Sequence, residues 1–212
     1  MPTFSRDRAL AEEFTREQAR YREQLSSSEA WEIAQLPGPL HLNLLTTSNF
    51  YTGVAESLAK HEGTLSLDRL TTLMTLQVAE ALAKHEGKLH LNGLTKLGDL
   101  EARALAKHQG DLYLNGLTRL SAAEAKELAR LDGALYLNGL KTLEYEAAEG
   151  LAKHKGALWL NGLLSIDRGV ADALAKHEGK LWLDGLTGTL SEKDFAALRK
   201  NPNINLPVKM DR

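Results

Sequence analysis

Aromatic residues recur at one fixed spacing in the second half of this 212-residue chain. They are Tyr113, Tyr136, Trp159 and Trp182, and His90 holds the same place one repeat earlier. Tyr and Trp combine a large apolar ring with one polar group, which suits the recognition of peptides or sugars. At ordinary strand spacing, the four Tyr and Trp rings would stack as a ladder about 14 Å long. The pattern therefore indicates a ligand-binding stripe, although such stacking would also stabilise an open sheet face by about 0.5–1.5 kcal/mol per pair.

Amide and carboxylate side chains form a second column, two residues after the aromatic position. Its members are Asn43, Asp68, Asn92, Asn115, Asn138, Asn161 and Asp184. Asn before Gly is typical of a turn, so we expect most of these side chains to bond the backbone of the turn. Asn138, Asn161 and Asp184 are also candidates to contact a ligand beside the aromatic rings.

Five histidines form a third column. Each follows a different predicted helix: His61, His85, His108, His154 and His177. Stacked imidazoles suggest a metal site, but Leu36 and Leu131 occupy the same position in other repeats, and a column of ligands would not accept Leu. We therefore predict no metal site. Neutral imidazoles that pack at the helix end and hydrogen-bond a turn carbonyl explain the column better.

The sequence contains none of the common catalytic motifs. It has no Gly-rich phosphate-binding motif, no G-x-S-x-G and no cysteine, and its carboxylates lie mostly on predicted helix surfaces. These features predict a protein that is not an enzyme and carries no cofactor.

The composition excludes several classes of partner. The net charge is −2 with many charges of both signs, whereas a nucleic-acid binder needs a basic face. No apolar run approaches 18 residues, so we expect no membrane span. Residues 5–22 are charged and lack the apolar stretch of a signal peptide, which makes the cytoplasm the default expectation and leaves the compartment open.

A period of 23 to 25 residues organises the whole chain. The first leucine of the motif G-x-L-x-L-N-G-L falls at 40, 65, 89, 112, 135, 158 and 181, and Ile204 takes the eighth place. Within one repeat, Leu89 and Leu91 alternate with polar residues, which predicts a short strand, and Asn92-Gly93 should end it through left-handed backbone angles. A fixed period of this length predicts a solenoid, in which neighbouring repeats complete one core.

A helix should follow each turn. Its expected N-caps are Thr75, Gly98, Ser121 and Asp167, with a capping box between Ser121 and Glu124. Ala102, Leu105 and Ala106 share one helical face, and Gly110 should end the helix as a C′ glycine. Strand–turn–helix repeats of this kind predict an α/β solenoid with a parallel sheet on the concave face and helices on the convex face.

Residues 25–206 resemble the leucine-rich-repeat family, in a bacterial short-repeat form. The L-x-L pairs, such as Leu112 and Leu114, carry the resemblance together with the helix leucines, such as Leu128. The chain departs from the family in placing Leu where the inward Asn usually stands; these residues are Leu94, Leu117, Leu140, Leu163 and Leu186. The resemblance implies a scaffold that binds proteins or peptides.

The ends of the repeat array differ from its middle. We expect one domain over residues 1–212, with a capping helix in 1–24, repeats over 25–188 and a C-terminal cap in 189–212. Leu10, Phe14, Tyr21 and Leu25 would form the apolar face of the capping helix. Extra loop should fall after the first two strands, around Thr46–Gly53 and Leu70–Thr75.

The preferred function is therefore a monomeric, non-catalytic scaffold that recognises a protein or peptide through the aromatic stripe. Two alternatives use the same rings. One is a carbohydrate-binding scaffold, with the rings as stacking platforms. The other is a structural repeat that self-associates through its aromatic face.

Overall fold

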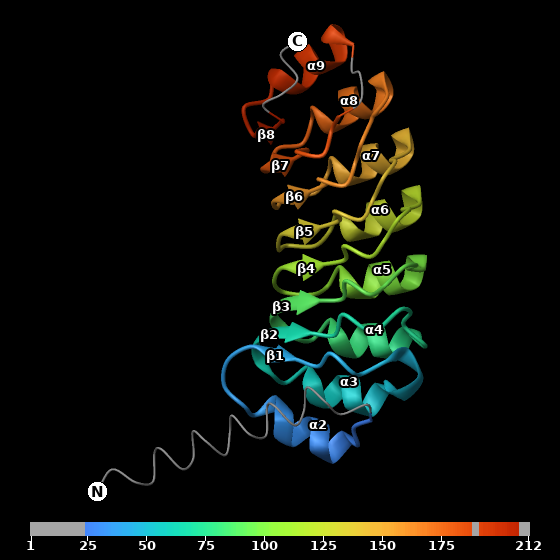
Figure 1. Ribbon diagram of the computed structural model, residues 1–212, viewed down its shortest axis with the longest axis vertical. Coiled ribbons are helices and arrows are strands. Elements are labelled where there is room, and N and C mark those ends of the chain that lie inside the picture. Colours follow the sequence, from blue (N-terminus) through green and yellow to red (C-terminus); the bar gives the residue numbers. More distant parts are fainter. Residues whose placement is uncertain (1–23, 188–190, 208–212) are drawn as a thin grey trace, which may run out of the picture.

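Strands and helices alternate along the chain and build one repeating stack (Figure 1). The computed structural model describes residues 24–187 and 191–207. Within them, eight strands form a single parallel sheet in chain order. The strands are β1 (Leu40–His41), β2 (Glu62–Ser66), β3 (Glu86–His90), β4 (Leu112–Tyr113), β5 (Leu135–Tyr136), β6 (Leu158–Trp159), β7 (Leu181–Trp182) and β8 (Ile204–Asn205).

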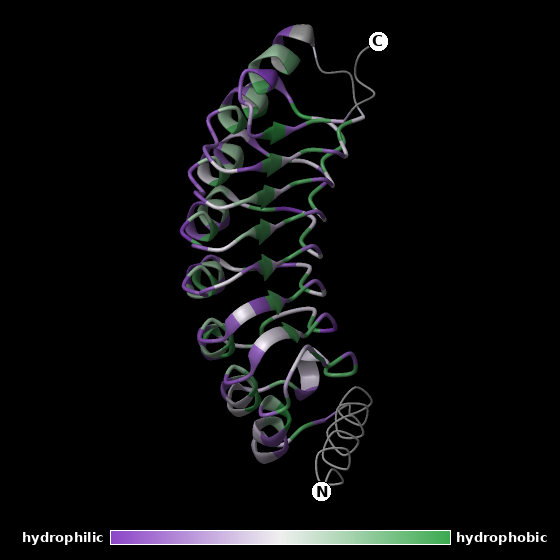
Figure 2. Ribbon diagram, turned by 90° about the vertical axis from the view of Figure 1, so that its left-hand side faces the viewer, coloured by the Kyte–Doolittle hydropathy of each residue, from purple (hydrophilic) through white to green (hydrophobic). Residues whose placement is uncertain are grey.

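The helices stack along one side of this sheet, each beside the helix of the next repeat (Figures 1 and 2). They are α2 (Ser27–Ala34), α3 (Thr52–Leu58), α4 (Leu76–Leu82), α5 (Asp99–Leu105), α6 (Ala122–Leu128), α7 (Tyr145–Leu151), α8 (Arg168–Leu174) and α9 (Glu192–Arg199). A short 3-10 helix, η1 (Thr47–Asn49), lies in the first long loop. A parallel sheet requires such crossovers because each strand must return to the same end before the next one begins.

The repeat period predicted the register of the sheet, and the register is confirmed. The eight residues in the first-leucine position pair with one another across the whole sheet, from Leu40 with Leu65 to Leu181 with Ile204. The residues that follow them pair in the same way, so Tyr113 faces Tyr136, and Trp159 faces Trp182. The aromatic column therefore lies on neighbouring strands.

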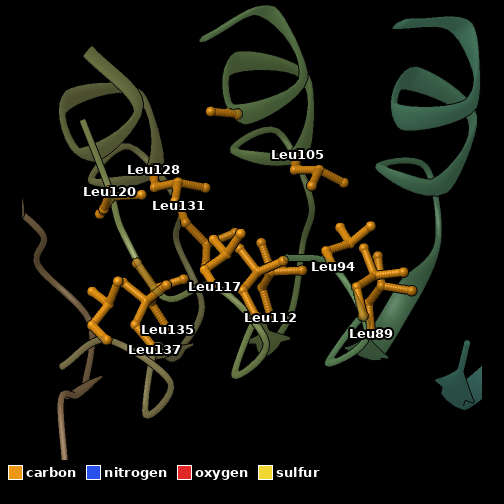
Figure 3. Packing of buried hydrophobic residues seen from close by; sticks show 14 of the residues in the cluster. Leu89, Leu94, Leu105, Leu112, Leu117, Leu120, Leu128, Leu131, Leu135 and Leu137 are labelled. Atoms are coloured by element: carbon orange, nitrogen blue, oxygen red, sulfur yellow. The ribbon is translucent and has the colours of Figure 1, made fainter. Parts of the chain in front are cut away.

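Leucines from strand, turn and helix meet in a continuous core between the two layers (Figure 3). In the repeat that begins at β3, Leu89, Leu94 and Leu105 are all fully buried. The predicted helical face is confirmed, because Ala102, Leu105 and Ala106 are buried together. Small alanines on this face let each helix lie close to the sheet.

The predicted helix caps are confirmed. The side chains of Thr75, Ser121 and Asp167 accept hydrogen bonds from the third helical amide, and Gly98 occupies the same position without a side chain. Ser121 and Glu124 form the expected capping box. A second capping box, between Ser26 and Glu29, begins α2 and was not predicted.

Two predictions about glycine were wrong. Asn92 and Gly93 do not adopt left-handed angles; the described residues with positive φ are Gly38, Gly63, Gly87 and Gly110. Gly93 is needed because a Cβ there would lie 2.2 Å from the Asp68 carbonyl of the preceding repeat. Gly110 is not a C′ residue either, since α5 ends at Leu105 with Ala106 as its C-cap.

The two predicted insertions lie between strand and helix in the first two repeats, as expected, and they contact each other. The Thr47 hydroxyl accepts hydrogen bonds from the backbone N–H groups of Thr71 (3.0 Å) and Thr72 (3.3 Å). The extra loops are thus joined at one end of the strands.

At the C-terminus, the region of the predicted cap contains α9 and β8, and Ile204 takes the eighth strand position as expected. At the N-terminus, α2 begins after its N-cap Ser26, inside the predicted repeat region 25–188. The predicted capping helix with Leu10, Phe14 and Tyr21 lies outside the described residues. No helix in the described ranges is long and apolar enough to cross a membrane.

Candidate functional site

The outward-facing position of five consecutive strands carries a continuous stack of rings. Neighbouring ring centroids lie 3.9 Å apart for His90–Tyr113 and Tyr113–Tyr136, and 4.0 Å apart for Tyr136–Trp159 and Trp159–Trp182. The planes of adjacent rings differ by 3° to 14°. The structure therefore brings His90 and the four predicted aromatics together in one array, which we call the ring stack.

Face-to-face stacking determines which parts of these rings a ligand can reach. Each inner ring has a neighbour on both faces, so its faces are covered and its edges remain. All five ring residues are half-buried. Within the described residues, neither indole N–H has a hydrogen-bond partner, and neither nitrogen is among the buried polar atoms that lack one. The ring stack consequently offers ring edges and polar groups rather than flat platforms.

Two members of the ring stack have pKa values shifted towards their uncharged forms. Burial is the main reason that the pKa of His90 lies below its usual value, although the Asp68 carboxylate opposes this shift. Burial also raises the pKa of Tyr136, and the Tyr113 hydroxyl beside it acts in the same direction. A ligand at these rings therefore meets a neutral imidazole and a protonated phenol.

The Asn/Asp column is a hydrogen-bonded ladder that runs beside the ring stack. Asn115 Oδ1 accepts from the backbone N–H of Asn138 (2.9 Å), and Asn138 Oδ1 accepts from that of Asn161 (3.0 Å). Asn161 Oδ1 then accepts from the Asp184 backbone N–H (3.0 Å). Bonding to backbone was predicted, but each partner lies in the next repeat rather than in the same turn.

The same ladder decides how Asn138, Asn161 and Asp184 could contact a ligand. One oxygen of each side chain is already engaged, since Asp184 Oδ1 accepts from the Asn205 amide. Asn138 and Asn161 are half-buried, whereas Asp184 is exposed. These side-chain oxygens tie neighbouring turns together, so a ligand would have to contact the polar atoms that the ladder does not use.

The histidine column is buried, as expected, with each of its five side chains at most 1% exposed. His61 Nδ1 donates to the Ala34 carbonyl (3.1 Å), and the Nε2 atoms of His85 and His108 donate to the carbonyls of Gly63 (3.1 Å) and Gly87 (2.9 Å). A bond from each ring to a backbone carbonyl was predicted, but these carbonyls belong to helix α2 and to strands β2 and β3 rather than to turns. His154 and His177 lie near backbone groups that raise their pKa values against the effect of burial, but no ring nitrogen of theirs meets hydrogen-bond geometry.

Leu131 divides this column into two blocks. Ring centroids lie 6.2 Å apart for His61–His85, 5.9 Å for His85–His108 and 6.2 Å for His154–His177. Leu131 is 2% exposed at the intervening position. Across the described residues, no group of three His, Cys, Asp or Glu side chains is arranged to hold a metal ion.

Two hollows lie near the first histidines, one lined in part by His61 and the other by His85. They measure about 460 Å³ and about 490 Å³. Lys60, Glu62 and Lys84 are among the residues that line the first, and Lys84, Glu86 and Lys107 among those that line the second. Sequence reasoning did not identify these hollows; their mixed charges show no preference for one kind of ligand.

Comparison with known proteins adds no family to this picture. No family model matches the chain, and no curated protein is similar to it in sequence.

Proposed function

We propose that this protein is a non-catalytic scaffold that recognises a protein or peptide segment through the exposed edges of the ring stack. The observation that carries the proposal is the continuous array of five half-buried rings on neighbouring strands. Tyr and Trp are the residues most often found at the energetic centre of protein interfaces. Contiguous exposed apolar surface is itself a common mark of an interaction site.

The resemblance to leucine-rich repeats supports placing this sheet face on the inside of the solenoid's curve. Ring centroids 3.9–4.0 Å apart are closer than the roughly 4.8 Å between neighbouring strands. Side chains that converge in this way fit a face on the concave side. A concave face would surround an extended ligand along its length.

The geometry favours a peptide over a sugar. Carbohydrate recognition by aromatic residues uses the flat face of a ring, and here the inner faces are covered by neighbouring rings. Edges with Tyr hydroxyl and Trp N–H groups suit backbone carbonyls and side chains of a peptide instead.

Peptides selected from a random displayed library on the wild-type protein test the proposal. We expect the folded double variant Trp159→Ala/Trp182→Ala to bind these peptides at least tenfold more weakly, a loss of about 1.4 kcal/mol or more. Trp31→Ala is the matched control, because Trp31 is 50% exposed on α2, in the first described helix of the stack.

Full binding by the folded double variant would contradict the proposal, as would a library that yields no peptide. Sedimentation of the wild-type protein separates self-association from ligand binding. A concentration-dependent dimer that the double variant loses would favour the self-associating alternative.

A further inference from the structure

A second column on the same sheet face lies two residues before the ring stack. Next to β4, β5, β6 and β7 it consists of Asp111, Ala134, Ala157 and Lys180, which we call the alanine strip. The backbone holds these residues in register, because the amide of each first leucine donates to the carbonyl of the strip residue in the next repeat at 2.8–2.9 Å. Since side chains alternate along a strand, the strip and the ring stack face the same side.

The middle of the alanine strip leaves the rings beside it uncovered. Ala134 and Ala157 are half-buried, and they precede Tyr136 and Trp159 by two residues along the chain. A methyl group reaches no further than the base of a Tyr or Trp side chain. On this side, the strip side chains therefore leave the outer edges of these two rings uncovered.

The ends of the alanine strip carry opposite charges. Asp111 lies at one end, and Lys180 lies three strands away, about 14 Å at ordinary strand spacing. One carboxylate oxygen of Asp111 accepts from the Ala134 backbone N–H (3.2 Å). Lys180 is exposed, and no described carboxylate lies within ion-pair distance of it.

Other charged groups border the strip. Lys88 lies one strand beyond Asp111, and no ion pair joins the two within the described ranges. Asp184 follows Trp182 in the Asn/Asp ladder, where the Asn205 amide bonds it. Between β4 and β7, Asp111 and Lys180 are the charged residues of the strip, and they carry opposite charges.

We propose that the alanine strip binds an extended peptide segment laid along the axis of the solenoid. A cationic side chain of the peptide contacts Asp111, an apolar side chain lies over Ala134 and Ala157, and an anionic side chain contacts Lys180. This assignment rests on the proposed function and names the ligand that it recognises. In an extended chain, residues i, i+2 and i+4 face one side and span about 14 Å, which matches the distance between the charged ends.

Blocked pentapeptides test the proposal directly. The probe is acetyl-Lys-Ser-Leu-Ser-Glu-amide, and its two controls carry Lys at both ends or Glu at both ends. Titration of tryptophan fluorescence at up to millimolar peptide should show at least tenfold tighter binding of the mixed peptide to the wild-type protein. Equal binding of the three peptides, or no binding of the mixed one, would overturn the proposal.

Charge reversal should switch the preference. We expect Asp111→Lys to prefer the peptide with Glu at both ends, and Lys180→Glu to prefer the one with Lys at both ends. Lys153→Glu makes the same charge change at the end of α7, on the helix side, and should leave the preference unchanged. An unchanged order of preference in both strip variants would refute the assignment of the two ends.

The ring variants keep this inference separate from the proposed function. If Trp159→Ala/Trp182→Ala retains the library-selected peptides, the proposed function itself fails. If that variant loses them while the strip variants show no switch, only the peptide orientation and charge pattern proposed here are wrong.

Discussion

Four buried imidazoles titrate below the usual pKa of histidine. Burial is the largest cause for His85, His108, His154 and His177, because it penalises the charged form. For His85, burial and the neighbouring His108 together lower the pKa to about 4, although a hydrogen bond to Gly63 opposes the shift. These residues are therefore neutral in the folded protein at neutral pH.

Acid should destabilise the protein through this column. In the unfolded chain the imidazoles titrate near pH 6.5, whereas in the folded chain they accept a proton only at lower pH. The unfolded state therefore binds more protons as the pH falls. Stability should be full above about pH 7 and decline from about pH 6.5 towards pH 4, with His85 alone contributing a loss of about 1 kcal/mol at pH 5.5. Thermal melts at pH 7.5 and pH 5.5 measure this loss.

Leucine variants patterned on Leu131 provide the control for the acid effect. His108→Leu and His154→Leu remove one titrating group each, so their melting temperatures should fall less between pH 7.5 and pH 5.5 than that of the wild type. Leucine variants that remain as acid-sensitive as the wild type would show that the column is not responsible.

At the level of the elements, Gly98 caps α5 without a side-chain hydrogen bond. It begins α5 with φ −94° and ψ 164°, values that Ser adopts readily, and Glu101 stands at the third helical position. Gly98→Ser should therefore create the same capping box as Ser121 with Glu124 and stabilise the protein by a few tenths of a kcal/mol. The atom nearest a Cβ at this position belongs to the flexible Glu101 side chain, which can move. Urea unfolding measures the gain.

The same substitution at a turn glycine is the contrasting control. A Cβ at Gly139 would lie 2.0 Å from the Asn115 carbonyl of the preceding repeat, and a backbone atom cannot withdraw as a side chain can. Gly139→Ser should therefore lower stability. If both serine variants change stability in the same direction, the proposed difference between Gly98, which caps a helix, and Gly139, which packs against a backbone carbonyl, is wrong.

The sequence predicted some elements well because the responsible interactions are local or repeat with the period. The strand register follows from the spacing of first leucines, and the caps at Thr75, Ser121 and Asp167 depend on bonds within four residues. The role of Gly93 was missed because it depends on the carbonyl of Asp68, 25 positions earlier in the chain. The partners of the Asn/Asp ladder were missed for the same reason.

The sequence also identified the five ring positions and predicted that the Tyr and Trp rings stack as a ladder, but it did not give the orientation of the rings within that ladder. Residue spacing places Tyr136 beside Trp159, whereas ring orientation depends on side-chain angles that a repeat pattern does not specify. Face-to-face stacking covers the inner ring faces, so a ligand can reach the ring edges rather than flat ring faces. This accessibility of ring edges is the reason that the proposed ligand is a peptide rather than a sugar.

At the scale of the whole molecule, each repeat packs only on its neighbours, so the position of a defect along the stack should matter. Leu135 is fully buried in the middle strand region, while Ile204 is partly exposed in the last strand. Leu135→Ala should cost about 2–5 kcal/mol and Ile204→Ala clearly less. Urea denaturation gives the two losses.

Hydrogen exchange locates these effects along the chain. Leu135→Ala should weaken protection on both sides of β5, whereas Ile204→Ala should weaken it mainly in β7, β8 and α9. Equal losses of stability and uniform loss of protection in both variants would show that the stack behaves as one indivisible unit.

From β3 to β7, equivalent residues recur every 23 positions without exception. The number of repeats in the stack can therefore change without a change in the structure of any one repeat. A second copy of residues 112–134, inserted after Ala134, would bring its own leucines, ring, asparagine and turn glycine into the existing columns. Each added copy would extend the ring stack by one member and the sheet by about 4.8 Å. The number of repeats would therefore set the length of the longest peptide segment that the proposed binding face can accommodate. Adding a copy would lengthen that face without reshaping a pocket.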